Sequence, residues 1–350
     1  MKYWNHRMNR MTEYIPGEQP DNIEEYIKLN TNENPFAPSQ TVLSAIKNAA
    51  NEELRRYPSS DSRSLRMAFA EKNNLQYENV FVGNGSDEIF TLIFRGFIEP
   101  DGLASFPYPS YSLYYTMAEA NGIKYDKVNL NDEFDINFED FLVKDYDLVI
   151  IANPNNPTGK SVDVEKIQDF LMNFKGLLVV DEAYVDFFGE TAINLVSSFD
   201  NIIVTRSFSK SYSLAGLRVG IAIAHKDIIR GFLKLKDSYN VDRIAEAGAI
   251  AALLDEKGFK YNIEMLKNNK EYIENILIDL GFSIVPSKAN YVFVKHAKMK
   301  SKDIYEKLKR KKILVRYMEG AIQSDYLRIS VGSMMEIKTL IKELYSILEA

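Results

Sequence analysis

The stretch SFSKSYSLAGLR, residues 207–218, is the most informative segment of the sequence. It follows a short apolar run at residues 202–205, which is typical of a buried β-strand. Lys210 therefore stands at a strand end among small and aromatic residues, where desolvation would lower the pKa of its amine and make it nucleophilic toward carbonyl carbons. The alternative is a lysine that extends its charged end into water, which is the more common fate of this residue type.

Short apolar runs alternate with amphipathic stretches on both sides of this segment. The strands expected in this first region are 80–82, 103–106, 148–152, 177–180, 202–205 and 219–224. Such alternation favours an α/β domain with a largely parallel sheet. Three helical patterns follow, and a second set of strands is expected at 282–285, 291–295, 313–315 and 327–331. This order predicts a smaller α+β domain at the carboxyl end.

Three further polar loops follow apolar runs: GNGSDE at 83–88, NPNNPTG at 153–159 and DEAY at 181–184. Ligands of open α/β sheets bind beyond the carboxyl ends of the strands. The first loop suits a phosphate, because glycines allow a tight turn and a helix start offers free N–H groups. The prolines of the second loop would hold the Asn156 amide in place. Asp181 is costly to bury without a cationic partner. An ordinary turn or helix cap is the alternative for each loop.

The composition excludes several classes of function. Apolar residues make up 46% and charged residues 26% of 350 residues, which indicates a globular chain of roughly two domains. The net charge of −6 does not favour binding to nucleic acid. An anionic ligand would therefore need a local site with positive charge or N–H donors. Cysteine chemistry is excluded, and His6, His225 and His296 do not cluster, so no metal site is expected. The polar N-terminus and the absence of long apolar runs predict neither a signal peptide nor a membrane span, so the expected location is the cytoplasm.

Together, the four loops supply the groups that pyridoxal 5′-phosphate (PLP) requires. This cofactor needs a lysine that forms an imine, a carboxylate that keeps the ring nitrogen protonated, donors to the ring oxygen and a phosphate site. NPNNPTG, DEAY and SFSKSYSLAGLR resemble the signatures of fold-type I aminotransferases, including the spacing from Asp181 to Tyr184 and from Lys210 to Arg218. The resemblance implies the α/β fold of PLP-dependent transferases of fold type I, with a mostly parallel mixed sheet in a large domain and a smaller α+β domain.

More segments along nearly the whole chain resemble histidinol-phosphate aminotransferases. They are YIPG (14–17), LNTNENP (29–35), RYP (56–58), PSY (109–111), YNV (239–241), VR (315–316) and YLRISVG (326–332), together with residues 83–88. The resemblance implies a ping-pong reaction in which glutamate gives its amino group to the cofactor and imidazole acetol phosphate receives it, forming histidinol phosphate.

The resemblance also implies a role for each matching residue. Lys210 would form the Schiff base and move the substrate proton, and Asp181 would pair with the ring nitrogen. Tyr184, the third catalytic residue, would hold the ring oxygen. The other cofactor contacts would come from Asn156 at the ring oxygen, Tyr111 on the ring face, and Gly85, Ser86, Asp87, Ser207, Ser209 and Arg218 at the phosphate, with Tyr57 reaching the phosphate of the partner subunit. The substrate would be held by Tyr14, Asn34, Arg316 and Arg328.

The expected organisation is an N-terminal arm (1–38), a large PLP-binding domain (39–255) and a small C-terminal domain (256–350). The arm is too poor in apolar residues to fold alone, which favours a homodimer with shared sites. The expected partners are a small-molecule amino donor and a 2-oxo acid, with neither nucleic acid nor membrane.

Alternative activities stay open on the same scaffold. Tyr317 and Ser238 stand where the family often has an acidic residue and a proline, and the loop 319–324 has no match in the family pattern. An aromatic amino-acid aminotransferase, a threonine-phosphate decarboxylase and a PLP-binding regulator without activity are therefore kept as alternatives, although no helix-turn-helix extension of the kind such a regulator carries is expected.

Overall fold

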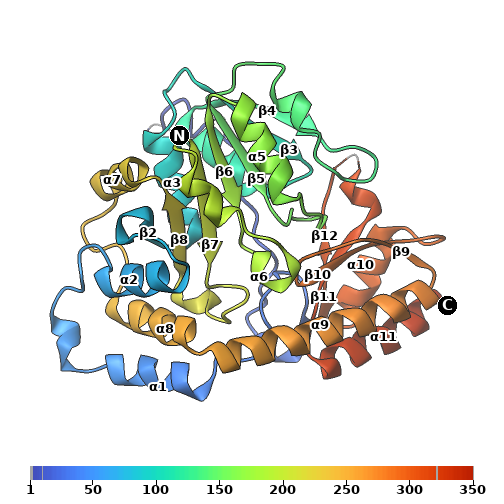
Figure 1. Cartoon of the computed structure of the whole chain (residues 1–350). Coiled ribbons are helices and arrows are strands. Elements are labelled where there is room, and N and C mark those ends of the chain that lie inside the picture. Colours follow the sequence, from blue (N-terminus) through green and yellow to red (C-terminus); the bar gives the residue numbers. More distant parts are fainter. Residues whose placement is uncertain (1–2, 10, 321, 350) are drawn as a thin grey trace.

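The computed structural model describes residues 3–9, 11–320 and 322–349, and its centre is a seven-stranded sheet (Figure 1). The strand order is β2-β8-β7-β6-β5-β3-β4. Strand β8 is antiparallel to both neighbours and the remaining pairs are parallel, as the predicted mostly parallel mixed sheet requires. The strands are β2 (Val80–Asn84), β3 (Leu103–Tyr108), β4 (Lys124–Asn129), β5 (Leu148–Ala152), β6 (Leu177–Asp181), β7 (Ile202–Ser207) and β8 (Val219–Ala224).

The central strands are apolar throughout because both faces of the sheet are covered. In β6, Leu178 and Val180 belong to one core and Val179 to the core on the other face. The first face is covered by α1 (Gln40–Ala49), α2 (Arg63–Lys72), α5 (Val164–Asn173) and α8 (Arg243–Leu254). The second face is covered by α3 (Gly85–Gly96), α4 (Leu113–Asn121) and α7 (Lys226–Leu235).

The edge strand β4 was not predicted from the sequence. Its residues KYDKVN are exposed or half-buried, so they lack the apolar run that marks the central strands. Pairing with β3, rather than burial of its side chains, places this segment in the sheet.

A second layer of structure has its own core and lies on one side of the central sheet (Figure 1). Its antiparallel sheet has the order β12-β13-β10-β9, and a parallel pair joins β1 of the arm to β11. The strands are β1 (Ile27–Lys28), β9 (Phe282–Val285), β10 (Tyr291–His296), β11 (Ile313–Leu314), β12 (Arg316–Tyr317) and β13 (Leu327–Ser330). The helices are α6 (Val185–Phe188), α9 (Glu256–Asp279), α10 (Ser301–Arg310) and α11 (Met334–Leu348).

The N-terminal arm is tied to this second layer. Leu29, which follows β1, is buried in its core, and Phe187 of α6 enters the same core. Seven 3-10 helices complete the described elements: Ile23–Glu25, Glu52–Arg55, Tyr77–Asn79, Phe138–Phe141, Ala192–Ser197, Ala215–Leu217 and Gln323–Asp325. Within the described residues, none of the helices has both the length and the apolar character needed to cross a lipid bilayer.

Candidate active site

A cavity of about 880 Å³ lies between the carboxyl edge of the central sheet, the arm and the second sheet. Because β2, β5, β6 and β7 run in one direction, the loops that follow them meet at this edge. The residues from the four sequence motifs that line the cavity are Ser86, Asp87, Asn156, Pro157, Asp181, Ala183, Tyr184, Ser207, Ser209, Lys210 and Arg218. Tyr14, Tyr111, Arg316 and Arg328 line it as well.

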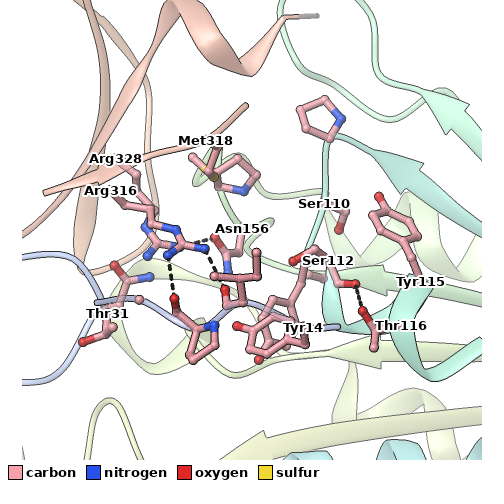
Figure 2. A pocket seen from close by; sticks show the side chains of 18 of the residues that line it. Tyr14, Thr31, Ser110, Ser112, Tyr115, Thr116, Asn156, Arg316, Met318 and Arg328 are labelled. Carbon is pink, nitrogen blue, oxygen red and sulfur yellow. Dashed lines mark hydrogen bonds between the residues drawn. The ribbon is translucent and has the colours of Figure 1, made fainter. Parts of the chain in front are cut away.

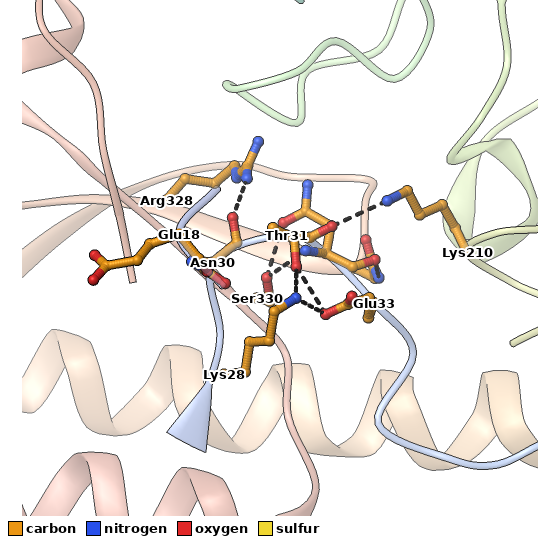
Figure 3. Close-up of polar contacts among 10 residues, drawn as sticks. Glu18, Lys28, Asn30, Thr31, Glu33, Lys210, Arg328 and Ser330 are labelled. Atoms are coloured by element: carbon orange, nitrogen blue, oxygen red, sulfur yellow. Dashed lines mark hydrogen bonds and ion pairs between the residues drawn. The ribbon is translucent and has the colours of Figure 1, made fainter. Parts of the chain in front are cut away.

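The Lys210 amine is available for chemistry. Its Nζ donates to the backbone oxygen of Thr31 at 3.0 Å (Figure 3). Burial, together with the nearby positive charge of Arg328, lowers the pKa of Lys210 from 10.5 to about 8. A larger fraction of this amine is therefore uncharged near neutral pH than in an ordinary lysine.

Asp181 ends strand β6 as a buried carboxylate. It accepts hydrogen bonds from Tyr114 Oη at 2.6 Å, Thr205 Oγ1 at 3.1 Å and the Ala183 backbone N–H at 3.2 Å. No ion pair from a described Lys, Arg or His reaches this carboxylate, and burial raises the pKa of Asp181. The site can therefore take a further donor or a positive charge from a ligand.

Tyr114 and Thr205 were not expected from the sequence to contact Asp181. Thr205 pairs directly with Asp181 across β6 and β7, so strand register could have indicated it. Tyr114 lies on the buried face of α4. Its hydroxyl is a polar group on this face, which indicates a contact with Asp181 less directly than strand register does for Thr205.

The NPNNPTG loop is fixed in place by Asn155. The Asn155 amide donates to the Pro109 oxygen and to Thr158 Oγ1, both at 3.0 Å, and its oxygen accepts from Ser110 Oγ at 2.9 Å. The neighbouring Asn156 faces the cavity, and its Oδ1 accepts from Arg328 Nη1 at 2.6 Å (Figure 2). Asn156, which is expected to bind the cofactor, is thus in contact with Arg328, which is expected to bind the substrate.

The start of helix α3 and Arg218 form one end of the cavity. Arg218 donates to Ser209 Oγ at 3.3 Å and to Asp87 Oδ2 at 3.0 Å. Gly85 opens α3 with a φ of +75°, and a Cβ at this position would lie 2.6 Å from Arg218 Nη2. A glycine is therefore required for the guanidinium to approach the helix start, where free N–H groups favour an anion.

Arg316 and Arg328 lie opposite each other on the neighbouring strands β12 and β13. The Arg328 guanidinium is buried, and its Nη2 donates to the Asn30 oxygen at 2.6 Å. Arg316 donates to the backbone oxygens of Ile15 and Pro16, each at 3.1 Å (Figure 2). It therefore holds the arm over the cavity.

Three expected site residues are not in the lining of this cavity: Gly85, which lies directly before the lining residue Ser86, Asn34 and Tyr57. The Asn34 amide group binds backbone atoms: it donates to the Ser211 oxygen at 3.3 Å, next to Lys210, and accepts from the Phe36 N–H at 3.1 Å, before α1. Tyr57 is 77% exposed and stacks on Tyr239 with 4.4 Å between the ring centres. Of the unmatched loop 319–324, Ala321 lies outside the described residues.

A buried group of charges, not foreseen from the sequence, lies behind the site. Arg206 contacts Glu182 at 2.8 Å and Asp186 at 2.6 Å, and Ser211 Oγ donates to Asp186 at 2.5 Å. Glu182 follows Asp181 directly and Ser211 follows Lys210. This group therefore ties together the two loops that carry the amine and the carboxylate.

The fold and the site define an α/β protein in which a desolvated lysine and a buried carboxylate face one cavity. The chain belongs to the aminotransferase class I and II family, whose model matches residues 24–344. This membership confirms the predicted fold class and the predicted enzyme class.

Full-length relatives agree with this assignment. The chain is 41% identical over 351 residues to a histidinol-phosphate aminotransferase of Clostridium beijerinckii, with 99% of this chain and 98% of the relative covered. It is 40% identical to the enzyme of the same name from Clostridium botulinum strain Okra, with 99% of each chain covered. The solved histidinol-phosphate aminotransferase from Sinorhizobium meliloti, in complex with PLP, superposes with a TM-score of 0.92 at 26% identity over 100% of this chain and 98% of that chain.

Proposed function

We propose that this chain binds PLP and converts histidinol phosphate and 2-oxoglutarate to imidazole acetol phosphate and L-glutamate, and the reverse. The observation that carries the proposal is the meeting of the Lys210 amine and the Asp181 carboxylate in one cavity. The name shared by the full-length relatives supports the choice of substrate.

The cavity fits PLP in two respects. The Asp181 carboxylate is buried without a described cationic partner, so it suits a protonated ring nitrogen. The close approach of Arg218 to Gly85 at the start of α3 suits a phosphate. The other proposed cofactor contacts are Ser86, Asp87, Tyr111, Asn156, Tyr184, Ser207 and Ser209, with Tyr57 of the partner subunit.

When bound, PLP supplies an electrophilic carbonyl carbon and an electron-withdrawing ring. Lys210 would take the proton from the substrate Cα and would return it to the cofactor carbon that is bonded to the amino nitrogen. Its lowered pKa suits both transfers, because an acid–base group works best with a pKa near the working pH. Asp181 would hold the proton on the ring nitrogen, and Asn156 and Tyr184 would donate hydrogen bonds to the ring oxygen.

The substrate pocket must accept two different anions in turn. Glutamate carries an α-carboxylate, whereas histidinol phosphate carries a phosphate ester and no α-carboxylate. A guanidinium binds either group with paired hydrogen bonds. Arg328 is therefore assigned to both anions, and Arg316 adds a second cation for the phosphate. Tyr14, whose ring meets that of Tyr111 edge-to-face at 6.1 Å, closes the pocket.

The wider organisation proposed for the molecule follows from the same observations. The separate cores support a large domain at 39–255, a small domain at 256–350 and an arm at 1–38. The exposed Tyr57 and the arm support a homodimer, and the expected location is the cytoplasm.

A product assay tests the proposal. The purified chain with PLP is given histidinol phosphate and 2-oxoglutarate, and glutamate formation is measured. Aromatic amino acids with 2-oxoglutarate and threonine phosphate alone are run in parallel. Faster glutamate formation from aromatic amino acids would favour the aromatic aminotransferase, and release of carbon dioxide from threonine phosphate would favour the decarboxylase. PLP binding without turnover of any substrate would favour a regulator.

A further inference from the structure

Asn32 is a buried residue of the arm that sequence analysis gave no role. Its side chain is 1% exposed and its φ is +56°, a left-handed conformation that few residue types other than glycine adopt. Its backbone N–H donates to Ser330 Oγ at 2.9 Å, and its backbone oxygen accepts from Asn290 Nδ2 at 3.0 Å. The residue is thus held from both sides by the second sheet and the segment before it.

These contacts determine which way the Asn32 amide points. Ser330 Oγ, which already accepts the Asn32 backbone N–H, donates its own proton to Asn32 Oδ1 at 2.9 Å (Ser330 is labelled in Figure 3). Asn32 Nδ2 then faces Tyr184 Oη at 3.0 Å. In the reverse orientation the buried Ser330 hydroxyl would lose its acceptor among the described residues, which costs free energy.

The direction of this bond determines what the Tyr184 hydroxyl can do. A tyrosine hydroxyl carries one proton. Because its oxygen receives an N–H from Asn32, that proton is free to be donated elsewhere. The Tyr184 ring is fixed edge-on against Tyr291, with 5.2 Å between the ring centres, and Tyr184 lines the cavity. The free proton is therefore available on the cavity side.

We propose that Asn32 is a positioning residue that makes Tyr184 a hydrogen-bond donor toward the ligand in the cavity. The inference rests on the proposed function, in which the acceptor is the ring oxygen of PLP. The hydrogen bonds from Ser330 to Asn32 and from Asn32 to Tyr184 together form a relay, in which Ser330 fixes the orientation of the Asn32 amide.

The bound cofactor reports on this hydrogen bond through its absorbance. At high pH the imine that Lys210 would form with PLP has lost its proton. The negative charge of the ring oxygen is then no longer balanced by that proton. A donor to this oxygen stabilises the high-pH form and lowers the pH midpoint of the absorbance change. Loss of the donor should therefore raise the midpoint.

The experiment compares three variants of the PLP-loaded protein. Asn32→Asp has the same shape but presents only acceptors, so it draws the Tyr184 proton away from the cavity. We expect its midpoint to rise by about one pH unit, the shift that corresponds to one hydrogen bond. Asn32→Gly tolerates the left-handed backbone and leaves the Tyr184 hydroxyl proton free to rotate, so its midpoint should rise less. Tyr184→Phe should raise the midpoint as Asn32→Asp does.

Double variants separate this relay from a simple effect of charge. In the Tyr184→Phe background, Asn32→Asp should shift the midpoint by less than half of its shift in the original protein. An undiminished shift there would overturn the proposal, because the effect would not pass through the hydroxyl. If Asn32→Asp does not fold, Asn32→Gly with Tyr184→Phe gives the same test, since additive shifts would equally reject the relay.

Asn269 provides the matched control. It is also 1% exposed, and it donates to the Gly332 oxygen at 2.9 Å, outside the cavity lining. Asn269→Asp should lower the melting temperature without moving the midpoint. A chain that bound no PLP would show no absorbance band, which distinguishes failure of the proposed function from failure of the relay. A band whose midpoint is the same in Asn32→Asp as in the original protein would overturn the relay alone.

Discussion

At the scale of single residues, the environment of Lys210 has a consequence for stability that can be measured without cofactor. The pKa of this lysine is about 8 in the folded chain against an ordinary value of 10.5. Between these values the unfolded chain binds more protons than the folded chain, so the free energy of unfolding rises with pH.

We predict that this rise disappears in Lys210→Met. Relative to the variant, the free energy of unfolding of the cofactor-free protein should rise by on the order of 2 kcal/mol between about pH 7 and pH 10.5. This rise is smaller than the full pKa shift implies, because solvent reaches part of the Lys210 side chain. Urea denaturation at several pH values measures both proteins. Parallel pH profiles would mean that the amine is not desolvated.

The Asp181 carboxylate gives a second prediction at this scale. Asp181→Asn should still bind PLP but should lower kcat by roughly 30-fold or more, the factor that corresponds to a charged hydrogen bond of about 2 kcal/mol. Tyr114→Phe keeps the charge and removes one of its donors, so kcat should fall by only about five-fold. A near-normal kcat in Asp181→Asn would show that another group holds the ring nitrogen.

At the scale of secondary-structure elements, the pairing of β12 with β13 brings two arginines to one wall of the cavity. Their settings differ, since Arg328 is buried against Asn156 whereas Arg316 holds the backbone of the arm. A phosphate has more oxygens and more charge than a carboxylate, so it gains more from the second cation.

We therefore predict unequal effects of removing the two side chains. Arg328→Ala should impair both half-reactions. Arg316→Ala should impair the reaction of histidinol phosphate more than that of glutamate, by about 1.5–3 kcal/mol in kcat/KM. Single-turnover kinetics with each substrate measure the difference, and Arg310→Ala, on the exposed surface of α10, is the control. Equal losses would remove the phosphate-specific role of Arg316 and favour the aromatic aminotransferase.

At the scale of the whole molecule, the exposed Tyr57 leads to a prediction about assembly. The protein should elute with the mass of two 40.1 kDa chains. If Tyr57 serves the cavity of the partner subunit, a mixed dimer of Lys210→Ala and Tyr57→Ala chains contains one cavity with both residues intact. Such dimers should regain about half of the original activity, whereas each variant alone stays low. Activity equal to the mean of the two variants, or full activity in a verified monomer, would refute the shared site.

Much of the fold and of the cofactor site follows from local patterns in the sequence. The apolar runs at 148–152 and 219–224 coincide with β5 and β8, because strands buried on both faces must be apolar throughout. The loops after β5, β6 and β7 meet at one edge because these three parallel strands end together. The contact of Asn34 with the substrate stays a prediction. Its amide binds the Ser211 oxygen and the Phe36 N–H, and no local pattern in the sequence shows the first of these contacts.

The sequence by itself determined the chemistry of the site: an amine at Lys210, a carboxylate at Asp181 and a glycine turn at Gly85. Only the tertiary structure decided how these groups are held. Tyr114 reaches Asp181 across 67 positions of the chain, and Asn32 reaches Tyr184 across 152. Contacts between such distant residues leave no periodic pattern or short motif, because they depend on how separate elements pack. The direction of each hydrogen bond is settled only when all partners of a buried group are in place.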